Sequence, residues 1–129
     1  MTPELTILTY AALLQVAQLA LTILFVDAQT GLKYGAGPRD TPHQKTGIAG
    51  RLDRALDNHY AALALFTIAV LVITLGDKSS PLTITCAWTY LIARILYVPA
   101  YLSGIPYLRS LIWTMGIGAT VTMLITALI

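Results

Sequence analysis

The stretch from Leu5 to Val26 reads LTILTYAALLQVAQLALTILFV and contains no charged residue. A helix that crosses the hydrocarbon core of a bilayer needs about 20 mostly apolar residues. The apolar residues form a continuous run, whereas the strands of a membrane β-barrel alternate apolar and polar residues. This stretch therefore predicts a membrane-spanning α-helix.

Three further segments of similar character follow along the chain. They are residues 55–75, 82–102 and 105–129, and we expect each of them to cross the membrane, as residues 5–26 do. The remaining sequence consists mainly of one long loop, residues 27–54, and leaves no room for a separate soluble domain. The prediction is a four-helix, up-and-down membrane bundle.

The composition of residues 1–129 agrees with one all-α integral membrane domain. Hydrophobic residues make up 57% of the chain, charged residues only 11%, and the mean hydropathy is +0.73. A soluble domain has about 25% charged residues, so soluble and disordered classes are excluded. The net charge is only +2, and no basic stripe is interleaved with aromatic residues, which argues against binding to nucleic acid.

The connectors between the spans carry typical helix-end signals. Thr2 precedes Pro3 and Glu4, which is typical of a helix N-terminus with a capping side chain and an acid near the positive dipole end. Residues 76–81 (GDKSSP) end one helix and begin the next in the same manner. Residues 103–106 (SGIP) form so short a connector that the third and fourth helices are expected to be antiparallel neighbours.

The distribution of basic residues predicts the orientation in the membrane. Four spans place both termini and residues 76–81 on one side, and the loop of residues 27–54 on the other. Of the eight basic residues, only Lys78 lies on the side of the termini. The positive-inside rule therefore predicts that the long loop is cytoplasmic and that both termini lie on the opposite side.

Arginines within or beside apolar segments are the most informative residues. Arg94 lies well inside a predicted span, Arg109 lies near the start of the fourth span, and Arg51 and Arg54 directly precede the second. An arginine at the centre of a span costs roughly 2.5–3.5 kcal/mol on insertion scales and usually faces a bundle interior or a wet cavity. The alternative is that the arginines extend to the lipid headgroups and anchor the helix ends.

Helical spacing places these arginines beside other polar side chains. Residues three, four or seven positions apart share one helix face, and all these faces meet near the cytoplasmic boundary. The predicted polar zone consists of Arg51, Arg54 and Asn58 on the second helix, Arg94, Tyr97 and Tyr101 on the third, and Arg109 at the start of the fourth.

The chemistry of this zone suits an anionic or thiol ligand. Guanidinium groups grip carboxylates and phosphates in a bidentate manner. A nearby cation also lowers the pKa of a thiol from about 8.5 and so favours the thiolate. No metal set is expected, because His43 and His59 are far apart and Cys86 would lie across the membrane. Asp53 and Asp57 are candidates for structural pairing with Arg54.

The remaining notable residues are expected to serve packing. His59 is expected to be a polar interface residue and not a catalytic base. Gln15 and Gln18 share a face of the first helix and are expected to bond to other helices. Cys86 is expected to be a small packing residue. Small residues are expected to allow close helix contact in the fourth helix, namely Gly116, Gly118 and Ala119.

Two motifs in this zone resemble a known family. Residues 51–58 (RLDRALDN), which open the second span, look like the signature of the MAPEG family, the membrane-associated proteins in eicosanoid and glutathione metabolism. Residues 93–101 (ARILYVPAY), followed by residues 108–110 (LRS), resemble the motif of that family in its third and fourth helices. With the span count and the polar loop, the resemblance covers nearly the whole chain.

The resemblance implies a homotrimer that holds glutathione between neighbouring protomers near the cytoplasmic face. It implies that Arg109 stabilises the glutathione thiolate and performs the chemistry, and that a lipophilic electrophile or hydroperoxide arrives from the membrane lipids. The compact bacterial members suggest the bacterial inner membrane. The residues implied to bind glutathione are Arg51, Arg54, Asn58, Arg94, Tyr97 and Tyr101.

One departure from the family pattern leaves other functions open. The family commonly has Glu, often followed by Tyr, three residues after the Asn, and this chain has Ala61 and Ala62 there. Loss of one charge-assisted hydrogen bond costs roughly 1.5–3 kcal/mol. The first reading is a glutathione transferase or peroxidase. The alternatives are a non-catalytic scaffold or accessory subunit with a degenerate glutathione site, and a small transporter or lipid-binding protein.

Overall fold

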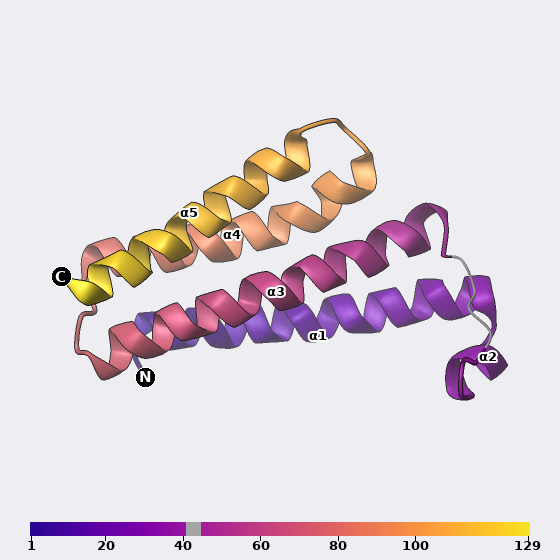
Figure 1. The fold of residues 1–129 in the computed structure, drawn as a ribbon, viewed down its shortest axis with the longest axis horizontal. Coiled ribbons are helices and arrows are strands. Elements are labelled where there is room, and N and C mark those ends of the chain that lie inside the picture. Colours follow the sequence, from indigo (N-terminus) through magenta and orange to yellow (C-terminus); the bar gives the residue numbers. More distant parts are fainter. Residues whose placement is uncertain (41–44) are drawn as a thin grey trace.

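The computed structural model describes residues 1–40 and 45–129 and contains four long helices and one short one within them (Figure 1). Each long helix is long and apolar enough to cross a membrane, which confirms the prediction of an all-helical integral membrane protein. No strand occurs in these two ranges. The helices are α1 (Pro3–Thr30), α2 (Leu32–Ala36), α3 (Gly47–Leu75), α4 (Pro81–Ser103) and α5 (Leu108–Leu128).

The four long helices run alternately up and down (Figure 1). Helix α1 packs against α3, and α4 packs against α5. The N- and C-termini lie at one end of the bundle, which we call the terminal end. Helix α2 and the α4–α5 turn lie at the opposite end, which we call the loop end.

Two helices begin as their sequences predict. The hydroxyl of Thr2 accepts a hydrogen bond from the backbone N–H of Leu5 at 3.3 Å and caps α1. At the start of α4, Ser80 and Thr83 form a reciprocal capping box. Both side chains satisfy N–H groups that have no partner within the helix.

Some boundaries differ from the predicted spans. Helix α1 extends to Thr30 and α3 begins at Gly47, so much of the predicted loop of residues 27–54 is helical. A membrane span is predicted from a run of apolar residues. A helix, however, can continue through charged residues as long as one of its faces stays buried, and the first turns of α3 bury Leu52 and Leu56 in this way. The fourth span was predicted to begin at residue 105, but α5 begins at Leu108. Tyr107, just before it, has a left-handed backbone with φ of +67°, which is not helical.

The apolar core lies between the helices and consists largely of small and aromatic residues. Phe66 of α3 stacks on Tyr90 of α4 with ring centroids 3.9 Å apart. Small residues let helix backbones approach closely without a hydrophobic driving force in lipid. The buried cluster is Ile7, Ala11, Ala62, Phe66, Ala69, Val70, Ile73, Cys86, Ala87, Tyr90, Leu91, Ala119 and Met123.

The predicted packing residues divide into those that pack as expected and those that do not. Gly116 does: a Cβ there would lie 3.5 Å from the Cβ of Ala93 on α4. By contrast, nothing lies within 4 Å of a Cβ at Gly118, so close packing there was predicted wrongly. Helical spacing identifies a shared face but does not determine which part of that face touches a neighbour.

The two glutamines of α1 also differ. Gln15 lies 3.2 Å from the ring nitrogen Nδ1 of His59, so both residues serve as interhelical polar contacts, as predicted. The amide of Gln18 is buried and has no hydrogen-bond partner in the described part of the chain, so the predicted bond is not made there.

Candidate functional site

Arg51 joins α3 to the end of α4. Its Nη1 donates to the backbone carbonyl of Leu102 at 2.9 Å. That carbonyl belongs to the last turn of α4, where four carbonyls lack partners within the helix. Gly104 follows in a left-handed conformation, and a Cβ there would lie 3.4 Å from the guanidinium of Arg51. The short turn is thus shaped to receive the guanidinium.

Tyr101 lies between two further guanidinium groups. Arg54 of α3 donates from Nε to the Tyr101 hydroxyl at 3.0 Å. Arg109, at the start of α5, places its Cζ 4.9 Å from the centroid of the Tyr101 ring, within the range of a cation–π contact. Three helices therefore converge on one tyrosine.

Arg94 occupies a deeper position than the other arginines. Its side chain is 2% exposed, and its Nη1 donates to Asn58 Oδ1 at 2.9 Å. Its Cζ lies 4.3 Å from the centroid of the buried Tyr97 ring. Its Nε and Nη2 atoms have no hydrogen-bond partner in the described structure. The contacts of Arg94 are thus with neutral groups, and none is with a carboxylate.

The arginines of this zone have no acidic partners in residues 1–40 and 45–129. The ion pair found in these ranges joins Lys45 Nζ to Asp53 Oδ2 at 3.2 Å, outside the zone. The predicted pairing of Arg54 with Asp53 or Asp57 is therefore wrong: Arg54 turns towards Tyr101, and Asp57 is exposed. A cluster of guanidiniums without counter-charges favours an anionic ligand.

A groove of about 390 Å³ opens beside this cluster at the loop end. Such a volume lies within the range of small-molecule sites. Sequence reasoning missed the contribution of the turn, because no pattern in residues 103–106 indicated that it would form a wall. The Gly–x–Pro spacing signals a tight turn but not what the turn faces. The groove is lined by Arg51, Ala100, Tyr101, Gly104, Ile105, Pro106, Tyr107, Arg109 and Ser110.

The predicted site residues form two connected layers. The outer layer contains Arg51, Arg54, Tyr101 and Arg109, and the inner layer contains Asn58, Arg94 and Tyr97. The rings of Tyr97 and Tyr101 connect the layers with centroids 5.8 Å apart in an edge-on arrangement. The structure thus brings all seven predicted residues into one region.

The two alanines at the departure from the family pattern lie in different environments. Ala61 is exposed on α3, whereas Ala62 is buried and lines a small void with Tyr90 and Arg94. In residues 1–40 and 45–129, no group of three His, Cys, Asp or Glu side chains is placed to hold a metal ion. His43 lies outside the described residues.

The sequence model described as the MAPEG family matches residues 7–129, nearly the whole chain. No curated protein and no solved structure matches the chain. The match covers α3, α4 and α5, all but the first four residues of α1, and the complete two-layered site.

Proposed function

Because the chain belongs to the MAPEG family, we propose that it is a membrane-bound glutathione transferase or peroxidase that acts on lipophilic electrophiles. Family membership supports a glutathione-related role in a membrane. The observation that carries the proposal is the placement of Arg54 and Arg109 on Tyr101, beside a groove of about 390 Å³, with no acidic partner in the described residues.

Arg109 is the proposed catalytic residue. Its guanidinium is exposed at the groove, where it would face the sulfur of bound glutathione. A cation beside a thiol lowers the thiol pKa from about 8.5 and raises the thiolate fraction at neutral pH. In conjugation, the thiolate forms a carbon–sulfur bond and the leaving group departs with its electron pair. In peroxidase turnover, two glutathione molecules are oxidised to the disulfide, and the hydroperoxide becomes an alcohol and water.

The other residues of the zone are proposed to hold the tripeptide. Glutathione carries two carboxylates, which match the guanidiniums of Arg51 and Arg54. Tyr101 offers a ring and a hydroxyl at the groove, and the buried Tyr97 supports Tyr101 from below.

Arg94 is proposed to contribute through Asn58. Its guanidinium donates to Asn58 Oδ1. This hydrogen bond fixes the orientation of the Asn58 amide, so that the donors of its Nδ2 group are directed away from Arg94. Those donors are the atoms that would bond to an acceptor on glutathione. Because Arg94 is only 2% exposed, we assign it a positioning role within the binding set.

The proposed setting is a homotrimer of one four-helix domain, residues 1–129, in the bacterial inner membrane. Its long loop would face the cytoplasm, because Lys78 alone among the basic residues lies on the other side. Large apolar side chains such as Leu13, Ile68 and Leu111 are exposed on the helices. They would contact lipid or neighbouring protomers, and a lipophilic substrate would enter from the lipid.

A second candidate function is a non-catalytic scaffold or accessory subunit with a degenerate glutathione site. The observation that favours it is Ala61, which leaves no carboxylate one turn beyond Asn58 to accept from the glutathione amino group. This function predicts that the arginines only anchor helix ends and that glutathione does not bind.

Glutathione binding to the purified protein separates the two functions. We expect calorimetry to show micromolar to low-millimolar binding, with thiolate absorbance near neutral pH that disappears in Arg109→Ala. Lys78→Ala, at the terminal end, is the matched control and should behave as wild type. No binding up to ~10 mM glutathione, weaker than the ~4 kcal/mol of millimolar affinity, would favour the scaffold.

A further inference from the structure

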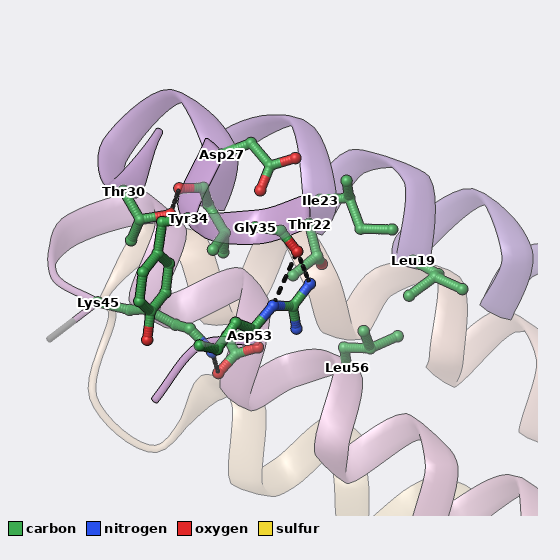
Figure 2. Close-up of a pocket in the computed structure, with 12 residues that line it drawn as sticks. Leu19, Thr22, Ile23, Asp27, Thr30, Tyr34, Gly35, Lys45, Asp53 and Leu56 are labelled. Atoms are coloured by element: carbon green, nitrogen blue, oxygen red, sulfur yellow. Dashed lines mark hydrogen bonds and ion pairs between the residues drawn. The ribbon is translucent and has the colours of Figure 1, made fainter. Parts of the chain in front are cut away.

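A second cavity lies on the opposite face of α3 from the arginine zone. It measures about 460 Å³, is open on one side, and is lined by α1, α2, the start of α3 and the adjoining residues Arg39 and Lys45 (Figure 2). Asp53 and Leu56, which line it, lie about half a turn around α3 from Arg54 and Asn58. The cavity shares no lining residue with the groove beside Arg109. Its volume falls within the range of ligand sites.

The part of the cavity nearer the middle of the bundle is apolar. Leu19 and Ile23 of α1 and Leu56 of α3 line it (Figure 2). Leu56 is buried, whereas Leu19 and Ile23 are 38% and 48% exposed. Because α1 is long and apolar enough to cross a membrane, these exposed side chains would face the hydrocarbon of the bilayer. This part of the cavity is therefore open to lipid chains.

The part nearer the loop end carries charges of both signs. Lys45 pairs with Asp53 at 3.2 Å. Arg39 donates from Nε and Nη2 to the carbonyl of Gly35 at 3.0 and 2.7 Å, and a guanidinium has five N–H donors in all. The carboxylate of Asp27 has no hydrogen bond or ion pair with any described residue. These four side chains carry two positive and two negative charges. With Lys45 and Asp53 paired, the guanidinium of Arg39 is available to an anion and the carboxylate of Asp27 is available to a cation.

The carboxylate of Asp27 is held in place by its packing against α2. It lies against Gly35, so closely that a Cβ at that position would collide with a carboxylate oxygen. Figure 2 shows Asp27 and Gly35 on neighbouring segments at the polar end of the cavity. Because residue 35 has no Cβ, the carboxylate of Asp27 can lie against the backbone of α2 at the wall of the cavity.

Thr22 provides an independent sign of a ligand. It is 4% exposed and lines the cavity, and its hydroxyl has no hydrogen-bond partner in the described part of the chain. Several helical threonines bond to the carbonyl four residues earlier, and Thr30, two turns further along α1, does so at 2.9 Å; the hydroxyls of Thr22 and of Thr74 on α3 do not, and of these two only Thr22 lines this cavity. A buried hydroxyl without a partner is rare and requires an explanation. A polar group of a bound molecule would supply the missing partner.

We propose that this cavity binds a phospholipid whose headgroup carries a primary ammonium group. The ammonium lies at Asp27, the phosphate lies at Arg39 with Lys45 beside it, and the acyl chains follow Leu19 and Ile23. The ester and glycerol oxygens lie at the level of Thr22. Polarity changes along the cavity in the same direction as along a lipid, from hydrocarbon to charged headgroup. A free phosphate would satisfy Arg39 alone and would leave the apolar part of the cavity empty.

Native mass spectrometry of the full-length protein in detergent tests this proposal. The protein is mixed with equal amounts of phosphatidylethanolamine, phosphatidylcholine and phosphatidylglycerol that carry the same acyl chains. We expect phosphatidylethanolamine to be retained about tenfold more than phosphatidylcholine, a ratio equivalent to about 1.4 kcal/mol. The quaternary ammonium of choline has no N–H to donate to Asp27, and phosphatidylglycerol lacks the cation.

Variants separate the two halves of the headgroup site. Asp27→Asn should abolish the preference for phosphatidylethanolamine over phosphatidylcholine, and Arg39→Gln should lower retention of all three lipids. The matched control is Lys33→Gln, because Lys33 lies on α2 but does not line the cavity. Glutathione affinity should be unchanged in Asp27→Asn, since this site is independent of the proposed function.

Three outcomes would overturn the proposal. They are equal retention of the three lipids by wild type, stronger retention of phosphatidylglycerol than of phosphatidylethanolamine, and an unchanged preference in Asp27→Asn. If Asp27→Asn does not fold, as judged by circular dichroism, the exposed Arg39→Gln variant decides: unchanged retention in that variant also contradicts the site.

Discussion

The two ends of the bundle both hold charged groups between helices, but they satisfy them differently. At the terminal end, the carboxylate of Glu4 is fully buried. It accepts hydrogen bonds from Ser79 Oγ at 2.7 and 3.0 Å and from Thr83 Oγ1 at 2.6 Å. In the half of the bundle towards the loop end, the buried Arg94 has one hydrogen bond, to Asn58, and two nitrogens without partners in the described residues.

This difference separates a structural polar cluster from a candidate functional one. The Glu4 cluster connects α1 to the start of α4 and uses its hydrogen-bonding groups internally. The arginine zone leaves donors available beside a groove. Buried groups in folded proteins normally have partners; the Glu4 cluster satisfies this rule within itself, whereas two guanidinium nitrogens of Arg94 have no partner in the described residues. The following variants test whether the two ends divide stability and function in this way.

The largest expected effect is the loss of turnover in Arg109→Ala. Removal of one group that stabilises a developing or resting anion typically lowers kcat by about 100- to 1,000-fold. The exposed side chain of Arg109 contributes little to packing, so the melting temperature in detergent should stay near wild type. Conjugation of glutathione to a lipophilic aryl halide provides the measurement. A variant that retains full turnover would remove Arg109 from the catalytic role.

The opposite pattern is expected for Glu4→Ala. Ser79 and Thr83 lose their acceptor in a buried place, which costs about 1–3 kcal/mol of unfolding free energy. Glutathione affinity of the folded fraction should not change, because the cluster lies at the other end of the bundle. Unfolding monitored by circular dichroism in detergent is the measurement.

Glu4→Gln is the matched control for this variant. The amide oxygen of glutamine still accepts from both hydroxyls, so most of the stability should return. Equal loss in Glu4→Ala and Glu4→Gln would show that the negative charge near the N-terminus of α4 matters more than the hydrogen bonds.

The sequence predicts the helices at both ends of the bundle, but not the side-chain contacts that join one helix to another. Apolar run lengths predict the four long helices, and three- and four-residue spacing places Arg51, Arg54 and Asn58 on one face. The bond from Arg51 to the Leu102 carbonyl depends on how the turn of residues 103–106 folds back. No local pattern encodes that contact, because it joins residues 51 positions apart in the chain.

The same limit explains what was missed at the terminal end. Glu4 reads as an acid in the first turn of α1, a common position near a positive helix end. Its bonds to Ser79 and Thr83 arise only when the α3–α4 connector returns to α1. Helix periodicity determines which residues share a face, whereas the rotation of each helix about its axis is set by packing against its neighbours.

A smaller effect is expected where Arg94 supports Asn58. Arg94→Met keeps much of the buried volume but releases the Asn58 amide, and we expect glutathione affinity to fall about tenfold, equivalent to about 1.4 kcal/mol. Asn58→Ala should cause a similar loss. In the double variant the two losses of glutathione affinity should not add, because each single change already removes the same Arg94–Asn58 hydrogen bond. Calorimetry on the four proteins measures this coupling, and additive losses would contradict a positioning role for Arg94.

The smallest expected effect is a gain, in Ala61→Glu. Ala61 is exposed one turn beyond Asn58, so a carboxylate there would lie beside the loop-end site and would accept from the amino group of glutathione. Solvent weakens such a pair to about 0.2–1 kcal/mol, which predicts an affinity increase of up to about fivefold. Ala61→Gln, which adds a similar volume without charge, is the matched control. If the two variants bind equally well, the glutathione amino group does not lie at residue 61, and the departure from the family pattern there does not limit binding.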